Sequence, residues 1–216
     1  CGKNVTLYDS SRLTLEEVVN IMKEADGAGL EVVRLHSGDP SIYGAIREQI
    51  DELCKLGIDF DITPGVTAAM AAAASLGLEF TLPGVTQSFV ITRMAGRTGV
   101  SEAESIERFV STGASVAVYL SSTLTSELTE RLVSCGISAD MPVAVVYKAS
   151  WEDERKLVCT LGALTETMQS EGIQGLAVIL LGSAVSQLSG QGGYERSRLY
   201  DPSFTTGFRK GADMPD

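Results

Sequence analysis

The sequence predicts an α/β protein made of two α/β domains, with a parallel sheet in the N-terminal domain and a mixed sheet in the C-terminal domain. Before Pro83, apolar strand-like runs alternate three times with helical patterns, as in parallel strands joined by crossover helices. After Gly84, five strand-like runs follow with chiefly three helical patterns among them, which favours a mixed sheet. The 216 residues, 44% of them hydrophobic, are enough for one large core or two modest ones.

The first strand–turn–helix segment is "VTLYDSSRLTLEEVVNIMKEADGAG". Its helix is expected to start after Thr14, because Glu17 stands three residues further on and completes a capping box. The apolar residues that would then share one face of the helix are Leu15, Val18, Val19 and Met22.

The second segment, "EVVRLHSGDPSIYGAIREQIDELCKLG", predicts a buried strand over residues 32–35 and a helix that stops at Gly57. Asp39 can cap this helix with Pro40 in its first turn, and its carboxylate is equally suited to offset the positive charge of a ligand. The third segment, "IDFDITPGVTAAMAAAASLGL", predicts a strand over residues 58–62 and a helix of small residues. Those small side chains leave room for a flat ligand, and they also suit a tightly packed helix.

Pro83 and Gly84 mark the expected domain boundary, because the strand–helix alternation changes there. We expect an N-terminal domain over residues 1–82, a C-terminal domain over residues 83–188 and an extended tail over residues 189–216. The expected strands of the C-terminal domain are Ser88–Arg93, Ser115–Leu120, Pro142–Tyr147, Lys156–Thr160 and Leu176–Leu181. Its expected helices are Glu102–Ser111, Thr125–Cys135 and Leu161–Gln169.

Charge and cysteine usage narrow the function. A net charge of -11 without a Lys/Arg-rich block argues against nucleic-acid binding, which depends on clustered cations. The four cysteines lie far apart without a CxxC pair and His36 is the single histidine, so no metal site is expected. The longest apolar stretches are too short to span a bilayer. We therefore expect a soluble cytoplasmic protein that binds a small or medium-sized ligand.

Residues 37–40 stand where an apolar run stops and a helical pattern begins. In open α/β sheets a ligand binds just beyond the carboxyl ends of the strands, which is where this turn is expected. Gly38 lets the backbone approach a ligand without a Cβ in the way. The same residues also suit a purely local strand–helix turn, and the pattern alone favours that simpler interpretation.

Four motifs, in this order and spacing, resemble the tetrapyrrole methylase family: "RLHSGDPSIYGA", "TPGVTAAMAAAASLG", "LPGVTQSFVITRMAGRT" and "PVAVVYKASWEDE". The resemblance covers nearly all of residues 4–210 and is greatest to the members that methylate carbon 11 of a corrin precursor in cobalamin synthesis. It implies two α/β domains with a ligand cleft between them and a tetrapyrrole substrate. It also implies S-adenosylmethionine as methyl donor, S-adenosylhomocysteine as product, and a homodimer.

The resemblance further implies which residues bind the cofactor. Those expected at its methionine and sulfonium end are Ser37, Gly38, Asp39 and Ile42. Those expected to contact it from the adjacent strand end are Thr67 and Ala68. Those expected to flank the adenosine from the second domain are Leu120 and Ala149, where Ala149 replaces the glycine of many relatives.

A tetrapyrrole carries several carboxylates, so an acidic protein must supply cations locally. The expected ones are Arg93 and Arg97 in "ITRMAGRT" and Lys148 in "YKASWEDER", whereas Arg155 is expected to be a solvated surface charge. Methyl transfer from a sulfonium is an in-line displacement that depends on positioning more than on acid–base catalysis. No catalytic residue is therefore assigned from the sequence.

The family opens with a strand and a glycine-rich GxGPGD loop, and neither stands in this sequence. We expect the chain to start after that first βα unit and for this reason to be weakly active or inactive. Three functions compete: a corrin-precursor methyltransferase, a methylase of the same fold with another tetrapyrrole or a macromolecular substrate, and a nucleoside-binding module without catalysis. A macromolecular substrate predicts an exposed basic face, and the sequence shows none.

Overall fold

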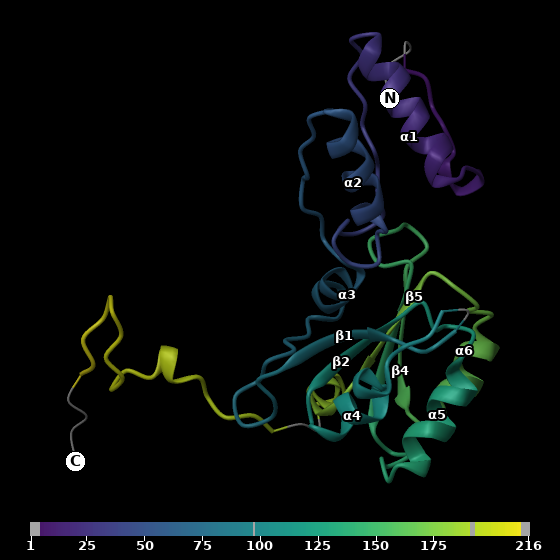
Figure 1. The fold of residues 1–216 in the computed structure, drawn as a ribbon. Helices are drawn as coiled ribbons and strands as arrows, with labels where there is room; N and C mark the ends of the chain where they lie inside the picture. Colours follow the sequence, from purple (N-terminus) through teal and green to yellow (C-terminus); the bar gives the residue numbers. More distant parts are fainter. Residues whose placement is uncertain (1–4, 97, 191–192, 213–216) are drawn as a thin grey trace. The chain divides into compact units, whose positions relative to one another are not determined.

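The structure, a computed structural model, describes residues 5–96, 98–190 and 193–212 (Figure 1). The chain forms two compact units, Cys1–Thr67 and Ala68–Asp216, called here the first and second unit. The division lies before the boundary expected at Pro83 and Gly84, because helix α3 (Ala68–Leu76) packs against the sheet of the second unit.

The first unit contains a short 3-10 helix, η1 (Ser10–Arg12), followed by helices α1 (Leu15–Gly27) and α2 (Ile46–Leu56), which pack against each other. The predicted capping box of α1 is confirmed. The Thr14 hydroxyl accepts from the Glu17 N–H at 3.3 Å, and the Glu17 carboxylate accepts from the Thr14 N–H at 2.8 Å. Gly57 ends α2 in a left-handed conformation with φ of 70°, as predicted.

The parallel sheet predicted for the N-terminal domain is not formed in residues 5–67. Residues 32–35 and 58–62 lie outside helices and strands, and the side chains of Val33 and Leu35 are exposed. The physical reason is that a strand needs hydrogen-bonded neighbours, and parallel strands pair stably only inside a sheet that is covered on both faces. The apolar runs alone therefore did not determine strand formation here.

The second unit contains a mixed sheet of five strands, as predicted: β1 (Phe89–Arg93), β2 (Ser115–Tyr119), β3 (Pro142–Tyr147), β4 (Arg155–Thr160) and β5 (Ala177–Leu181). Their spatial order is β1-β2-β5-β3-β4. Strand β1 pairs parallel with β2, whereas the β2–β5, β5–β3 and β3–β4 pairs are antiparallel. Strands β1, β2 and β3 consequently run in the same direction.

Helices cover both faces of this sheet (Figure 1). One face packs against α4 (Ile106–Ser111), α5 (Thr125–Ser134) and α6 (Leu164–Ser170), with Val116 and Val118 of β2 among its buried residues. The other face packs against α3 and the 3-10 helix η3 (Ser183–Ser189), with Ala117 of β2 between the two valines. Alternating residues of one strand thus enter two cores, as the two-residue period of a strand requires.

The predicted elements of the C-terminal domain are confirmed to within three residues at their ends, except that residues 102–111 split into the 3-10 helix η2 (Glu102–Glu104) and α4. In the described part of the tail, the regular structure beyond η3 is the 3-10 helix η4 (Arg198–Tyr200). Among the residues that the structure describes, no helix is long and apolar enough to cross a membrane.

Candidate functional site

The first group of candidate residues lies in the turn over residues 37–43 of the first unit. The carboxylate of Asp39 accepts hydrogen bonds from the Ser41 N–H at 2.8 Å, from the Ser41 hydroxyl, and from the Gly65 N–H at 2.9 Å. Asp39 thereby joins this turn to the Pro-Gly turn that precedes Thr67. The sequence predicted both turns at the ends of strands on one sheet edge. In the structure the two turns contact each other, but the residues before them do not form strands.

The expected capping of a helix by Asp39 is wrong. Helix α2 begins at Ile46, with Ala45 at its N-cap position and no side-chain hydrogen bond there. The positive φ values of Tyr43 and Ala45, 54° and 49°, prevent the helix from extending back to Pro40. The acceptor oxygens of Asp39 instead close a turn on Ser41, which aspartate does readily.

Two glycines allow the two turns of the first unit to meet. Gly38 has a φ of 72°, which glycine adopts without steric cost. A Cβ at Gly65 would overlap the carbonyl group of Gly38, so the close approach requires glycine at this position. The contact between the turns therefore depends on backbone atoms and on Asp39, and it leaves Ser37 and Gly38 exposed.

The pKa of Asp39 is lowered, chiefly by the hydrogen bond from the Ser41 hydroxyl and then by those from the Gly65 and Ser41 N–H groups. The side chain is therefore a carboxylate at neutral pH. Of the other candidates near this turn, Ile42 is half-buried and Thr67 is buried. Ala68 is exposed and is the first residue of α3 in the second unit.

The second group of candidates lies at one edge of the sheet in the second unit. Strands β1, β2 and β3 all end there, and their register pairs Arg93 with Tyr119 and Tyr147 with Ala177. We call this the carboxyl edge, made of residues 93–94, 119–121, 147–149 and 176–177. It therefore brings Arg93, Leu120, Lys148 and Ala149 to the same edge of one sheet.

Backbone strain is concentrated at the carboxyl edge. Leu120, Lys148 and Leu176 are not glycines, yet their φ values are 54°, 49° and 54°. The Lys148 N–H donates to the Leu176 carbonyl at 2.8 Å, so the β3 and β5 ends are joined here. Leu120 and Leu176 are also 72% and 67% exposed. Strained residues with exposed apolar side chains at a sheet edge are typical of a binding site.

Leu176 was not among the residues expected from the sequence. It precedes β5 and belongs to an apolar run that reads simply as a buried strand. Its position beside the β3 end becomes visible only through the sheet order, in which β5 lies between β2 and β3. A leucine after "SEGIQG" gives no local signal for a left-handed backbone.

Helix α3 is joined to the carboxyl edge by its first turn. The N–H of Ala69 donates to the hydroxyl oxygen of Tyr119 at 2.6 Å. The buried hydroxyl of Ser121 donates to the Tyr119 carbonyl and accepts from the Met94 N–H at 2.9 Å. These bonds hold the start of α3 and the ends of β1 and β2 in one arrangement, with the candidates Ala68 and Leu120 on the joined segments.

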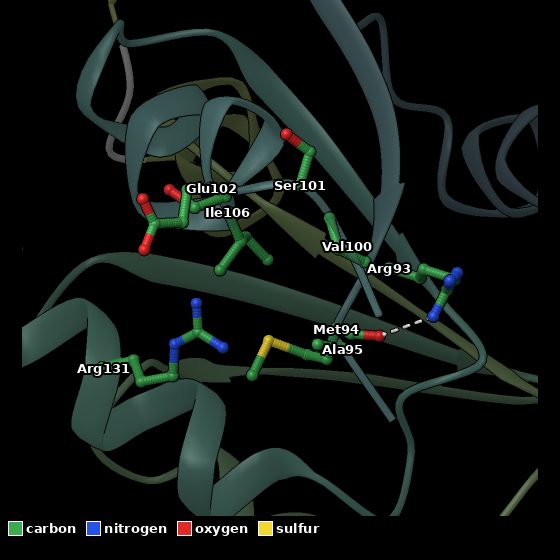
Figure 2. A pocket seen from close by; sticks show the side chains of 9 residues that line it. Arg93, Met94, Ala95, Val100, Ser101, Glu102, Ile106 and Arg131 are labelled. Atoms are coloured by element: carbon green, nitrogen blue, oxygen red, sulfur yellow. Dashed lines mark hydrogen bonds between the residues drawn. The ribbon is translucent and has the colours of Figure 1, made fainter. Parts of the chain in front are cut away.

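The expected substrate cations are engaged in different ways. The guanidinium of Arg93 donates to the carbonyl of Met94 at 3.1 Å (Figure 2). It also donates to the carbonyls of Thr98 and Gly99 at 3.1 and 2.9 Å, which closes the loop after β1. Lys148 forms an ion pair with Asp153 that raises the pKa of the lysine. Arg97 lies outside the described residues.

Lys148 also contacts aromatic rings. Its Nζ lies 5.1 Å from the ring centre of Tyr147 and 5.2 Å from that of Trp151. The guanidinium of Arg155 lies 4.6 Å from the same Tyr147 ring and forms an ion pair with Glu171 at 3.0 Å. Arg155 is thus a partly solvated structural cation, close to what the sequence predicted for it.

A pocket of about 100 Å³ lies between the end of β1, the start of α4 and α5 (Figure 2). Its lining residues are Arg93, Met94, Ala95, Val100, Ser101, Glu102, Ser105, Ile106 and Arg131. Ligand pockets commonly measure roughly 300–1,000 Å³, so this one is too small for a macrocycle. It lies beside the end of β1, where Arg93 and Met94 line it.

The sequence matches the family described as Tetrapyrrole (Corrin/Porphyrin) Methylases over residues 3–165. It is 43% identical to the cobalt-precorrin-4 C(11)-methyltransferase of Methanocaldococcus jannaschii over 208 residues, which are 96% of this chain and 79% of that protein. It is 40% identical to the precorrin-4 C(11)-methyltransferase of Pseudomonas aeruginosa over 194 residues, 90% of this chain and 76% of that protein.

Solved structures agree with these relatives. A cobalt precorrin-4 methyltransferase matches with a TM-score of 0.80 and 42% identity, covering 82% of this chain and 74% of that one. A uroporphyrin-III C-methyltransferase from Thermus thermophilus, in complex with S-adenosylhomocysteine, matches with a TM-score of 0.62 and 25% identity. That match covers 80% of this chain and 74% of the other.

Proposed function

The chain belongs to the tetrapyrrole (corrin/porphyrin) methylase family, and we propose that it methylates carbon 11 of precorrin-4 or cobalt-precorrin-4 in cobalamin biosynthesis. It is a methyltransferase that uses S-adenosylmethionine. The observation that carries the proposal is the identity of 43% over 96% of this chain with an enzyme of that name. The motifs with the candidate residues fall inside the matched segment.

The residues present fit such a cofactor. A ligand with a charged amino-acid end and a flat adenosine end needs a polar turn and an apolar surface. The first unit supplies an exposed Ser37-Gly38 backbone beside the Asp39 carboxylate, which suits the ammonium and sulfonium charges. The second unit supplies the exposed side chain of Leu120 after β2 and the backbone of Ala149 after β3, both at the carboxyl edge, which suits the adenosine.

S-adenosylmethionine supplies a methyl group activated by its sulfonium. The protein must then place the nucleophilic carbon in line with the methyl–sulfur bond and exclude other geometries, which can contribute several kcal/mol. We assign the cofactor to Ser37, Gly38, Asp39, Ile42, Thr67, Ala68, Leu120 and Ala149. We assign the substrate carboxylates to Arg93, Arg97 and Lys148, since cations bind carboxylates through charge-assisted hydrogen bonds.

We further propose a homodimer in the cytoplasm. The described cysteines Cys54, Cys135 and Cys159 are free thiols, which suits a reducing compartment. Light scattering after size-exclusion chromatography will measure the mass in solution. A single species of twice the chain mass is expected, and a species of one chain mass at all concentrations would contradict the dimer.

The activity is tested with S-adenosylmethionine carrying a ¹³C-labelled methyl group and with metal-free or cobalt-loaded precorrin-4. We expect one labelled methyl group at carbon 11 by NMR and one equivalent of S-adenosylhomocysteine. Isothermal titrations with S-adenosylhomocysteine, adenosine, ATP and NAD provide the binding control. Preference for ATP or NAD, or methylation at another carbon, would overturn the proposal.

A further inference from the structure

Glu154, in the loop between β3 and β4, is joined to two separate segments of the second unit. Its carboxylate accepts from the Ser150 N–H at 2.6 Å and from the hydroxyl of Ser75. The Nζ of Lys156 lies 3.8 Å from the same carboxylate and donates to the Ser75 carbonyl at 2.7 Å. The Glu154 side chain is only 18% exposed, so these bonds are partly shielded from water.

The first of the two segments is the turn over residues 148–151. Its Lys148 and Ser150 have φ values of 49° and 71°, which non-glycine residues adopt only when surrounding contacts hold them. The hydrogen bond from the Ser150 N–H to Glu154 is such a contact, since it holds one of these two residues directly. Ala149, which stands between them, therefore depends on Glu154 for its backbone position.

The second segment is helix α3, in which Ser75 is the residue before the last. Its first turn is held by the hydrogen bond from the Ala69 N–H to Tyr119, at the end of β2. Its last turn is held by Glu154, at the end of the β3–β4 loop, and by Lys156 of β4. Both ends of α3 are thus joined to segments that leave or enter the carboxyl edge, and these segments include Leu120 and Ala149.

We propose that Glu154 is a positioning residue for S-adenosylmethionine. It fixes the position of the turn that contains Ala149 relative to helix α3. The inference rests on the proposed function, in which Ala149 and Ala68 contact the cofactor. Glu154 itself points to Ser75 and Ser150, so it is not placed in contact with the ligand. Its pKa is lowered, first by the hydrogen bond from Ser75, and the carboxylate is therefore ionised at neutral pH.

The test compares Glu154→Ala, Glu154→Gln and Ser75→Ala with Glu152→Ala, a matched control at an exposed carboxylate of the same loop. For Glu154→Ala we expect the Kd for S-adenosylhomocysteine and the KM for S-adenosylmethionine to rise on the order of tenfold. The KM for the tetrapyrrole should stay unchanged. Glu154→Gln keeps one acceptor oxygen, so its Kd and KM should rise less than those of Glu154→Ala. Glu152→Ala should have the Kd and KM of the wild type.

A double variant separates positioning from general support of the fold. If Glu154 acts through Ser75, then Ser75→Ala combined with Glu154→Ala should lose no more affinity than Glu154→Ala alone. Amide hydrogen exchange without ligand should be faster at Ser150 and in the last turn of α3 in Glu154→Ala. If the variant does not fold, Ser75→Ala gives the same measurements with a smaller expected rise in Kd.

Two outcomes overturn the inference in different ways. A lower Tm in both Glu154→Ala and Ser75→Ala with unchanged Kd and KM would show that the contacts only support the fold. Failure of the wild-type protein to bind S-adenosylhomocysteine would instead overturn the proposed function, and with it the role given to Glu154. The two failures are distinguished by the wild-type titration alone.

Discussion

Strand β2 and residues 32–35 are both short apolar segments, but their surroundings differ. Val116 and Val118 of β2 are 1% exposed, whereas Val33 and Leu35 in the first unit are 71% and 76% exposed. Strand β2 has β1 on one side and β5 on the other, and helices cover both faces of the sheet. Residues 32–35 lie outside any strand. The difference teaches that neighbours, more than apolar composition, decide whether such a segment becomes a strand.

The largest effect on the free energy of unfolding is expected in the core of the second unit, where apolar side chains are fully buried. Leu132 of α5 is fully buried, so Leu132→Ala should lower the free energy of unfolding by about 2–5 kcal/mol. Val33→Ala should change it by less than about 0.5 kcal/mol, because Val33 is exposed. Urea unfolding measures both, and Trp151, the single tryptophan, reports on the second unit by fluorescence. Similar losses in the two variants would break the comparison.

The next effect concerns ligand binding by the second unit. Arg93→Ala should weaken tetrapyrrole binding at least about tenfold, since a shielded charge-assisted hydrogen bond is worth about 1.5–3 kcal/mol. The affinity for S-adenosylhomocysteine should not change. Arg93→Lys is the matched control, because it keeps the charge and loses the fork that closes the loop over residues 94–99. Equal losses for both ligands in Arg93→Ala would show that Arg93 only supports the loop.

The corresponding effect in the first unit is expected at Asp39. Asp39→Ala removes the bonds to Ser41 and Gly65 and should raise the Kd for S-adenosylhomocysteine several-fold, with tetrapyrrole binding less affected. Because hydrogen bonds lower the pKa of Asp39, this contribution should persist above the ordinary aspartate pKa and vanish as pH falls through the lowered value. Titrations across that range test it. An unchanged Kd together with a lower Tm would assign Asp39 to the turn alone.

The smallest effect is expected from the ion pair between Glu107 of α4 and Arg131 of α5. The Nη2 atom of Arg131 lies 3.0 Å from the Glu107 carboxylate. The hydrogen bond from Arg131 lowers the pKa of Glu107. The contribution of this ion pair to the free energy of unfolding is therefore present above the ordinary glutamate pKa and is lost as pH falls through the lowered value. Arg131→Ala should lower the free energy of unfolding at neutral pH by about 1 kcal/mol, since Arg131 is partly solvated. The loss should shrink at low pH, and an equal loss at both pH values would contradict this.

Much of the second unit could be predicted from the sequence, because local signals and the final fold agree there. Pro142–Tyr147 was predicted residue for residue, and its four middle residues are all buried, as expected for a strand inside a sheet that is covered on both faces. In the first unit the helices were also predictable, since the capping box at Thr14 and the stop at Gly57 are local features. Such features act through neighbours a few residues away, so the sequence alone carries them.

The predictions failed where the outcome depends on distant residues. Helix α2 starts at Ile46 and not at Pro40, because Tyr43 and Ala45 have positive φ values, and Asp39 accepts from Gly65, which is 26 residues away in the chain. Leu176 was missed because its place at the carboxyl edge follows from the strand order. The site residues themselves came from four motifs in order, and their assignment to cofactor or substrate remains a prediction that the titrations above address.

Strand β4 has a further consequence, for self-association. It lies at one end of the sheet, so one side of its backbone has no partner strand within the described residues, and Val158 is exposed on it. Such an edge can template aggregation by pairing with another chain, and a lysine on the strand opposes this, because a further strand would have to desolvate its charge. Lys156 is that lysine, and its bonds to Ser75 and Glu154 keep it in place. Replacement of Lys156 by an apolar residue should therefore lower the concentration at which the folded protein starts to aggregate.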